Sequence, residues 1–515
     1  MNNGFKNIIL STLCVMMSLV VASCTPSVPE NAVDNGKDVT VFPDYTDVYI
    51  PYNIAPLNFH IYDSLATDFV SVVEDKSGNR LVAGGEDAQF DEDDWHTMLE
   101  ANKGGDLTVT VYARIDDQWE RFKPFKFHVA EEPIDEYISY RYIEASYKNY
   151  NELSICQRNL TNFDESVIIS NKYLGGIDAS SEYQCMNCHN YQNYHTDNFQ
   201  FHVRYYLGGT IIVRDGKAEK YSLKTDSTIG AGVYTSFHPT EPIIAYSLSH
   251  TVQTFLINEA DHKIEVLDTL SDLVIYHIDT NEIQIVQNSF NSFETYPSWS
   301  PDGKYLYYSS CYFELEGKDT HYELANHYDR IQYDIIRQAY DAKTRQFGEP
   351  DTVFKAKELG KSATHARVSP DGRYLLVSVG DFGNFQLHHL ESDLYVKDLQ
   401  TDSLHPLSKM SAMNRAESYH VWSSNGRWIL FSTRREDGTY TRLYIGYFDK
   451  DGKDYKAFAL PQRDPLYNKK LLKAFNLGEF MVEPVKISQQ ELADVIRKEA
   501  VPAKFYSNYE KKTNK

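Results

Sequence analysis

Residues 298–309 read Ser-Trp-Ser-Pro-Asp-Gly-Lys-Tyr-Leu-Tyr-Tyr-Ser, and similar segments begin at Ser236, Arg367 and Val421. In each copy, a polar turn separates a short strand-like run from a nearly all-apolar run. An Asp-Gly or Asn-Gly pair supplies the positive φ angles that a tight hairpin needs, except in the first copy. A strand that is apolar on both faces suits burial between stacked sheets. We therefore predict that each copy is a β-hairpin inside a set of packed sheets.

The spacing of the copies predicts the wider architecture. They lie 62, 69 and 54 residues apart, which suits four-stranded propeller blades with long loops. Two less regular β-rich stretches, 137–171 and 199–221, raise the expected number of blades to six, with seven as the alternative. A late strand at 480–487 is expected to complete the first blade, because an open ring would leave an exposed edge.

The turn motif resembles that of TolB-type, WD40-like (PD40) β-propellers, whose blades carry a Ser-Pro-Asp-Gly-Lys/Arg turn. The resemblance is closest at 300–304 and 369–373, is weaker at 424–427, and lacks the glycine at 239–241. It implies a propeller over residues 134–487. A propeller fold by itself says little about function.

The regions on either side of the predicted propeller have different patterns. Residues 39–130 alternate apolar and polar side chains in short runs, which predicts a small β-sandwich domain. Residues 25–38 are rich in Pro, Asn, Asp and Gly and predict a flexible tether. At the other end, Ser488 and Glu491 form a capping-box pattern, so 488–515 is expected to be a helix followed by a tail. The predicted fold class is all-β, with a propeller preceded by a sandwich.

The first 24 residues have the order of an export signal. Lys6 precedes an apolar run of about 15 residues, which is short for a membrane span. Residues 21–24 resemble a bacterial lipobox, which implies lipidation of Cys24; an ordinary secretory signal and a buried apolar strand are the alternatives. Thr25 follows the cysteine, and by resemblance to lipoprotein sorting rules this favours the outer membrane. We therefore expect an outer-membrane lipoprotein that faces the periplasm or the cell surface, with the membrane as a partner through its lipid.

Composition and motifs limit the classes of partner and reaction to be expected for this protein. The net charge of −22 and the pI near 5.2 speak against a nucleic-acid partner, because phosphate needs a basic face. The sequence has no nucleophile elbow, zinc-protease helix motif or phosphate loop. An enzyme is therefore the least supported class of function.

The strongest chemical motif is Cys-Met-Asn-Cys-His at 185–189. Two thiols at this spacing can add to the vinyl groups of haem, and the next residue can ligate the iron. We therefore predict covalent haem c, attached to Cys185 and Cys188 and ligated by His189. The resemblance to c-type cytochromes is limited to these five residues. The motif lies in 175–198, which we expect to be a loop inserted into the propeller.

A second axial ligand would make the haem an electron-transfer centre. His202 is the first candidate, because a strand holds its side chain rigidly, and Arg204 on the same side could meet a haem propionate. Further candidates for the ligand are His195, Met413 and His420.

Two other structures compete with haem at this motif. Cys185 and Cys188 could form a disulfide, or they could bind zinc together with His189 and His195. For Cys156 and Cys311, a disulfide and buried free thiols are both open.

Two functions follow from these alternatives. The first is electron transfer or redox sensing by a tethered haem protein, with a redox protein or an outer-membrane protein as partner. The alternative is a non-catalytic TolB-like scaffold or ligand-binding lipoprotein in an outer-membrane complex, with Cys185 and Cys188 as a disulfide.

A final pattern concerns the position just before each turn. Tyr234, Tyr296, His365 and Tyr419 occupy equivalent places in the four copies and could gather near a central channel. Either a binding ring or ordinary packing would explain the repetition.

Overall fold

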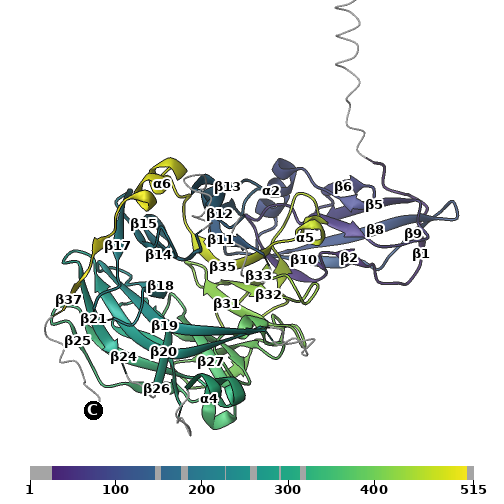
Figure 1. The fold of residues 1–515 in the computed structure, drawn as a ribbon. Helices are drawn as coiled ribbons and strands as arrows, with labels where there is room; N and C mark the ends of the chain where they lie inside the picture. Colours follow the sequence, from purple (N-terminus) through teal and green to yellow (C-terminus); the bar gives the residue numbers. More distant parts are fainter. Residues whose placement is uncertain are drawn as a thin grey trace, which may run out of the picture.

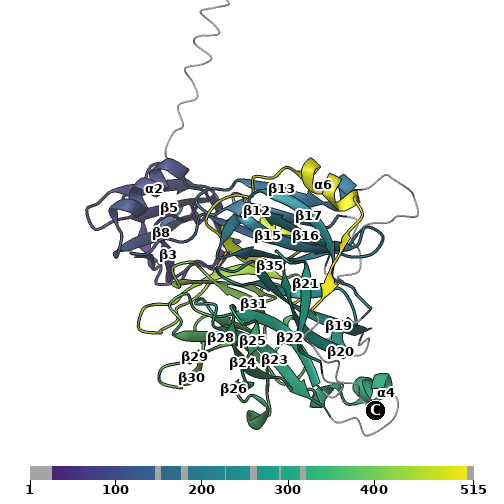
Figure 2. The same cartoon turned by 90° about the vertical axis from the view of Figure 1, so that its left-hand side faces the viewer.

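The computed structural model of the chain describes residues 26–144, 152–174, 184–226, 228–255, 264–288, 292–313 and 320–506. The fold is all-β, and from residue 137 onward its sheets are arranged around a common centre (Figures 1 and 2). Helices are short and lie at the edges. None of the helices in the described ranges is long and apolar enough to cross a bilayer.

The sheets around this centre are each built from antiparallel strands that follow one another along the chain. The first contains β11 (Tyr137–Ile143), β12 (Ser154–Asn159) and β13 (Glu165–Ser170). The second contains β14 (Met186–Gln192), β15 (His195–Val203), β16 (Gly209–Arg214) and β17 (Lys217–Ser222). The third contains β18 (Gly232–Phe237), β19 (Ile243–Phe255), β20 (Ile264–His277) and β21 (Glu282–Gln287).

The later sheets have the same order. The fourth contains β22 (Ser292–Trp299), β23 (Tyr305–Tyr312), β24 (Asp334–Asp341), β25 (Gln346–Phe347) and β26 (Asp351–Phe354). The fifth contains β27 (Ser362–Val368), β28 (Tyr374–Gly380), β29 (Asp393–Asp398) and β30 (Leu404–Pro406). The sixth contains β31 (Glu417–Trp422), β32 (Trp428–Thr433), β33 (Arg442–Tyr447) and β34 (Phe458–Ala459).

The end of the chain returns to the first sheet. Strand β35 (Ala474–Met481) pairs antiparallel with β11, from Tyr137 opposite Met481 to Ile143 opposite Ala474. In Figure 1 the yellow β35 lies beside the blue β11. A late strand was predicted at 480–487, but the paired segment is Ala474–Met481, because the buried residues Ala474 and Phe475 pair with β11 as Phe480 and Met481 do.

The repeated turns form the predicted hairpins, and they share one hydrogen-bonding pattern. In the copy at 298–309, the amide of Tyr305 donates to Ser300 Oγ at 3.0 Å, and Ser300 Oγ donates to Asp302 at 2.6 Å. Gly303 has φ of +69°, and its amide donates to the carbonyl of Ser300. Ser369 and Ser423 make the same contacts in their turns.

In the copy that begins at Ser236, which lacks the turn glycine, a side chain closes the turn instead. The ring nitrogen Nδ1 of His238 accepts hydrogen bonds from the amides of Thr240 and Glu241, at 3.2 and 2.9 Å. An imidazole therefore closes the turn that lacks the Asp-Gly pair.

The N-terminal region forms two further sheets and one helix. The larger sheet contains β1 (Val33–Asp34), β3 (Val48–Pro51), β5 (Asp68–Glu74), β6 (Arg80–Gly84), β8 (Asp106–Ile115), β9 (Gln118–Arg121) and β10 (Phe125–Ala130). The smaller contains β2 (Val41–Phe42), β4 (Phe59–Ile61) and β7 (Asp87–Ala88), and helix α2 is Glu92–Ala101. Strand β1 lies within the predicted tether and pairs with β9.

The N-terminal region packs on the sixth sheet. Tyr45 is fully buried, and its hydroxyl donates to the carbonyl of Ala459 at 3.3 Å. The rings of Tyr49 and Tyr447 stack at 5.4 Å. One continuous apolar core joins the two regions across this contact.

The C-terminal segment adds small elements to the outer edges of the sheets. Helix α6 (Gln489–Arg497) begins at Ser488 with the predicted capping box to Glu491. Strands β36 (Val501–Pro502) and β37 (Lys504–Phe505) then pair with β17 and β21. The remaining short helices are α3 (Asn171–Leu174), α4 (Thr320–Asn326), η1 (Tyr328–Arg330), η2 (Lys357–Leu359), η3 (Gln386–His388) and α5 (Tyr467–Lys470).

The hairpin β19–β20 is much longer than the others, at 13 and 14 residues. It reaches the loop around η3, where His389 Nε2 meets Glu265 Oε2 of β20 at 2.8 Å. Asn384 donates to Asp268, also on β20, at 2.6 Å. The hairpin of the third sheet is therefore anchored on the fifth.

Candidate functional site

The inner strands of the sheets carry an unusual backbone conformation at one equivalent position. Here the pairing register shifts and a residue other than glycine has a positive φ of 47° to 58°. A bulge of this kind re-aims a side chain. The residues are Cys188, Tyr234, Tyr296, His365, Tyr419 and Leu477, which we call the axial ring.

The side chains of the axial ring meet at the centre of the molecule. The rings of Tyr234 and Tyr296 lie 4.4 Å apart, those of Tyr296 and His365 stack at 3.7 Å, and Tyr419 meets His365 edge-on at 4.6 Å. All six residues line one cavity of about 40 Å³, which has room for only a few water molecules. The four residues singled out by the repeat do gather, and they fill the centre of the molecule.

The axial ring is uncharged at neutral pH. Burial holds the pKa of His365 well below its usual value, with smaller contributions from His420 and Arg367. Burial also raises the pKa of Tyr234 to about 12. The ring therefore separates the two ends of the inner strands as a neutral layer.

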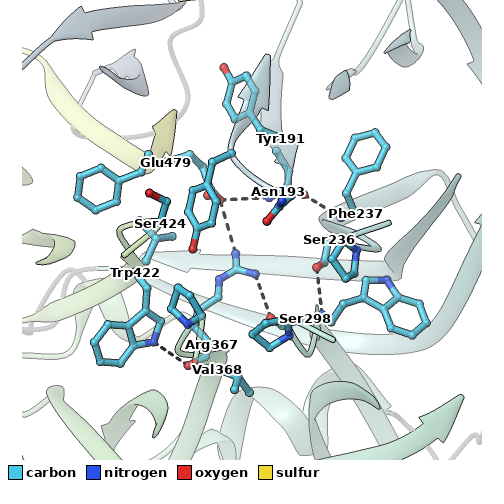
Figure 3. A pocket seen from close by; sticks show the side chains of 18 of the residues that line it. Tyr191, Asn193, Ser236, Phe237, Ser298, Arg367, Val368, Trp422, Ser424 and Glu479 are labelled. Atoms are coloured by element: carbon cyan, nitrogen blue, oxygen red, sulfur yellow. Dashed lines mark hydrogen bonds and ion pairs between the residues drawn. The ribbon is translucent and has the colours of Figure 1, made fainter. Parts of the chain in front are cut away.

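A pocket of about 490 Å³ lies at the end of the inner strands where the repeated turns are found (Figure 3). We call it the turn pocket. Its wall combines aromatic and proline side chains with serine hydroxyls. The apolar members include Phe237, Pro239, Trp299, Pro301, Pro370, Trp422 and Phe480.

A charged pair lies in the wall of the turn pocket. The guanidinium of Arg367 lies between Glu479 and Ser298, at 3.6 Å from Glu479 Oε1 and 3.4 Å from Ser298 Oγ (Figure 3). Burial raises the pKa of Glu479, while Arg367 and a hydrogen bond from Asn190 lower it. Both charged residues also line the small cavity of the axial ring. They connect the pocket to the centre of the molecule.

A second pocket, of about 280 Å³, lies on the other side of the axial ring. We call it the arginine pocket, because Arg141 and Arg204 line it and none of the described lining residues is Asp or Glu. Tyr234 and Tyr419 of the axial ring form part of its wall. The hairpin β19–β20 supplies a further side through Ser249, Thr251, Gln253 and Val266.

The Cys-Met-Asn-Cys-His motif does not lie on an inserted loop, as was predicted for 175–198. Residues 175–183 fall outside the described part of the chain, but Met186–Gln192 is the inner strand β14 and pairs with β15. Cys188 is the axial-ring residue of this strand, and the amide of Tyr234 donates to its sulfur at 3.4 Å. The second cysteine therefore occupies the place that tyrosine or histidine takes in four of the other sheets and leucine in the fifth.

The geometry of β14 does not fit covalent haem. Cys188 and His189 line the cavity of about 40 Å³, whereas pockets for drug-sized organic ligands measure about 300–1,000 Å³. Cys185 lines the arginine pocket instead. Burial lowers the pKa of His189 to about 3, so its imidazole is neutral in the core. The prediction of haem c at Cys185, Cys188 and His189, with iron on His189, is wrong.

The other residues assigned to haem have ordinary partners or positions. His202 is buried, and its Nδ1 lies 3.1 Å from Thr210 Oγ1. It does line the same pocket as Arg204, as their spacing predicted. Their assigned roles as distal ligand and propionate partner fall with the haem. Met413 is 89% exposed on a loop, and His420 is buried beside Ser378.

The competing predictions for the motif are also not met. Cys185 and Cys188 are free thiols, and so are Cys156 and Cys311. Over the described ranges, no group of three or more His, Cys, Asp or Glu side chains could hold a metal ion. His195, which the zinc alternative required, is exposed and lies 3.9 Å from Glu483.

Sequence reasoning missed the three charged residues that distinguish the two pockets. Arg141 lies in the strand Tyr-Ile-Ser-Tyr-Arg-Tyr-Ile, where a lone arginine in an apolar run was a usable signal. Arg367 and Glu479 each stand two residues after an axial-ring position. That offset could have revealed Arg367 and Glu479, and the repeated axial-ring position could have revealed Cys188.

The comparisons with known proteins agree with a propeller and point to a different family from the one expected. Residues 271–474, fewer than half of the chain, match the family model of the prolyl oligopeptidase N-terminal β-propeller domain. No curated protein sequence is similar enough to count as a match. The finding corrects the resemblance to TolB-type, PD40 lipoproteins, and it gives no support to the cytochrome, lipoprotein and outer-membrane descriptions.

A search of solved structures finds distant similarities. Puromycin hydrolase is 11% identical, with a TM-score of 0.37, over 62% of this chain and 45% of its own. Prolyl oligopeptidase B from Galerina marginata is 10% identical, with a TM-score of 0.37, over 63% and 44%. The tricorn protease is 10% identical, with a TM-score of 0.29, over 81% and 41%.

These identities and coverages limit which properties can be transferred from those proteins to this chain. The chain spans less than half the length of those proteins, so their activities do not follow for it. The predicted signal segment and its lipid anchor at Cys24 lie outside the described part of the chain. The location of the protein and its attachment to a membrane therefore stay predictions. What the family match and the sheets establish together is an all-β fold that contains a β-propeller domain, similar to the N-terminal propeller of prolyl oligopeptidases.

Proposed function

We propose that the sheets from β11 to β35 are the blades of one six-bladed propeller. The support is that each contributes a single positive-φ residue to the axial ring and that β35 pairs with β11. We also propose that the two N-terminal sheets form a small β-sandwich, as the alternating pattern of 39–130 predicts.

We propose further that this propeller binds peptide segments in the turn pocket. The observation that carries the proposal is the composition of this pocket: proline and aromatic side chains surround a charged Arg367–Glu479 pair in about 490 Å³. Apolar walls with a few convergent polar groups are typical of ligand sites, and this volume lies within their usual range. Flat rings can hold proline and aliphatic side chains of a peptide, while the serine hydroxyls can pair with its backbone.

The match to a peptidase-type propeller agrees with a peptide as ligand. It does not extend to cleavage. The propeller model is the part of prolyl oligopeptidases that this chain resembles, and catalysis is not part of the proposal.

The test is direct binding of labelled peptides. Fluorescein-labelled ten-residue peptides with one central proline, in acidic, neutral and basic versions, would be titrated by anisotropy. We expect binding in the micromolar range. Val482→Trp, which places a large ring in the pocket wall, should weaken binding at least tenfold.

A matched substitution separates pocket filling from a general effect of a new tryptophan. Val252 lies on β19 and is 36% exposed, and it is not among the residues that line the turn pocket. Val252→Trp should bind peptides like the wild type. No binding by any peptide, or equal loss in both variants, would overturn the assignment.

A further inference from the structure

Arg141 is a buried cation for which the described residues offer no counter-charge. Its side chain is 4% exposed, yet no described residue makes an ion pair or a hydrogen bond with the guanidinium, and the Nε atom is buried without an acceptor. A buried charge without a partner is strongly destabilising, since burial removes its hydration and nothing replaces it. The chain retains this residue in the middle of β11, between paired strands on both sides.

The surroundings of Arg141 add to the positive potential. Arg204 lines the same pocket, and none of the described lining residues is acidic. Both arginines act electrostatically on Cys188, where they lower a thiol pKa that burial raises. His202, which also lines the pocket, is kept neutral because burial lowers its pKa to about 3. In a protein of net charge −22, arginines are thus the only fixed charges among the described residues that line this cavity.

The pocket also contains unpartnered acceptors. The amide oxygens of Asn187 and Asn476 are buried and accept no hydrogen bond from the described residues. Asn476 lies opposite Arg141 in the β11–β35 pairing, so a cation and an acceptor are adjacent in the wall. A ligand that satisfies both must carry an oxyanion together with hydroxyl or amino donors.

We propose that the arginine pocket binds a small organic acid, whose oxyanion is held by Arg141 and Arg204 and whose hydroxyl or amino groups donate to Asn187 and Asn476. The volume of about 280 Å³ suits a molecule of this size. The site lies on the opposite side of the axial ring from the turn pocket, so it does not depend on peptide binding there.

The first experiment measures thermal unfolding of the full chain with tartrate, succinate or inorganic phosphate, against chloride at constant ionic strength. Tartrate supplies oxyanions and hydroxyls, succinate supplies oxyanions alone, and phosphate tests a tetrahedral anion. We expect tartrate to raise the unfolding temperature by several degrees and succinate to raise it less. Peptides with a free or an amidated C-terminus distinguish a chain terminus from a free acid as the source of the carboxylate.

Arg141→Gln is the decisive variant, because its effect on the unfolding temperature without ligand separates the two roles. Loss of a structural arginine would lower that temperature. We expect the variant to unfold at the same temperature as the wild type or higher, and to lose at least tenfold in affinity for tartrate by calorimetry. Val482→Trp should leave tartrate binding unchanged, which separates this site from the turn pocket.

Arg158, on the neighbouring strand β12, is the matched control. It is 3% exposed, but its guanidinium donates to the carbonyl of Pro461 at 2.9 Å and to Gln462 Oε1 at 3.2 Å. Arg158→Gln should unfold at a lower temperature and keep its response to tartrate. If Arg141→Gln is destabilised like Arg158→Gln, or if no anion shifts the wild type beyond chloride, the proposal is overturned.

Discussion

Glu265 on β20 and His389 after η3 form an ion pair at 2.8 Å in which both side chains are 1% exposed. They are 124 residues apart in the sequence: Glu265 belongs to the third sheet, and His389 lies in the connection between β28 and β29 of the fifth. A second carboxylate, Glu391, lies 3.3 Å from the other ring nitrogen of His389. This contact holds the long hairpin β19–β20 beside the arginine pocket.

Loss of the ion pair should be costly and should depend on pH. Burial alone would lower the pKa of His389, but Glu265 and Glu391 raise it to about 9. The pair therefore stabilises the fold fully below pH 6.5 and loses this effect as the pH rises through 9. We expect His389→Gln to lower the free energy of unfolding by about 3–5 kcal/mol at pH 6.5, and by less at pH 9.5. Urea unfolding at both values measures this; an equal loss at both would contradict it.

Asp268 should make the protein less stable as the pH rises, in a lower pH range than His389. Burial raises its pKa to about 7, against the hydrogen bonds from Tyr333 and Asn384 that lower it. The folded state then holds a proton that the unfolded chain has lost between about pH 4 and 7, so stability falls as the pH rises through this window. Asp268→Asn should remove this pH dependence, which amounts to at most about 4 kcal/mol over the whole window at 1.36 kcal/mol per pKa unit. Parallel curves for variant and wild type would rule this out.

The turn glycines offer a matched pair of substitutions. Gly303 and Gly372 have φ of +69° and +75°, so alanine at either position is strained by about 1–2 kcal/mol. A Cβ at Gly303 would come within 2.3 Å of the ring of His238, whereas one at Gly372 meets nothing within 4 Å. Gly303→Ala should therefore cost about 1–3 kcal/mol more than Gly372→Ala. Chemical denaturation measures both, and equal losses would show that His238 moves aside freely.

Tyr296 tests how much the axial ring contributes to stability. It stacks on His365 and contacts Tyr234, and it is 5% exposed. Tyr296→Ala leaves a cavity at the centre of the molecule and should cost about 3–5 kcal/mol. Tyr296→Phe keeps the ring and should cost much less. Similar unfolding temperatures for wild type and Tyr296→Ala would mean that the ring is not a packing centre.

The thiols should be reduced but unreactive in the folded protein. Cys156, Cys185, Cys188 and Cys311 are free and buried. Burial raises the pKa of Cys156 and of Cys311 to about 12, so little thiolate is present at neutral pH. A chromogenic disulfide reagent should label these four thiols only after denaturation without a reductant, as mass spectrometry of peptides would show. Fewer labelled thiols would indicate a disulfide or a covalent cofactor.

The repeat allowed much of the propeller to be predicted, because its signals are local. The turn at 300–303 needs only a serine, an aspartate and a glycine within four residues, and these contacts form as the pattern indicates. The capping box at Ser488 is equally local. By contrast, the strand that pairs with β11 was displaced by several residues in the prediction, since its position depends on a partner more than 330 residues away.

The amino-acid sequence by itself determined the hairpins, the all-β class and the places of the equivalent positions, because hydrophobic period and turn chemistry act over a few residues. Only the tertiary structure decided what those positions do. The bulge at Cys188 turns a haem-like motif into part of a packed centre, and the pairing of β11 with β35 leaves Arg141 buried beside Asn476. Burial and the identity of neighbours from distant strands set the charge state and the partners of each side chain, and no local pattern records them.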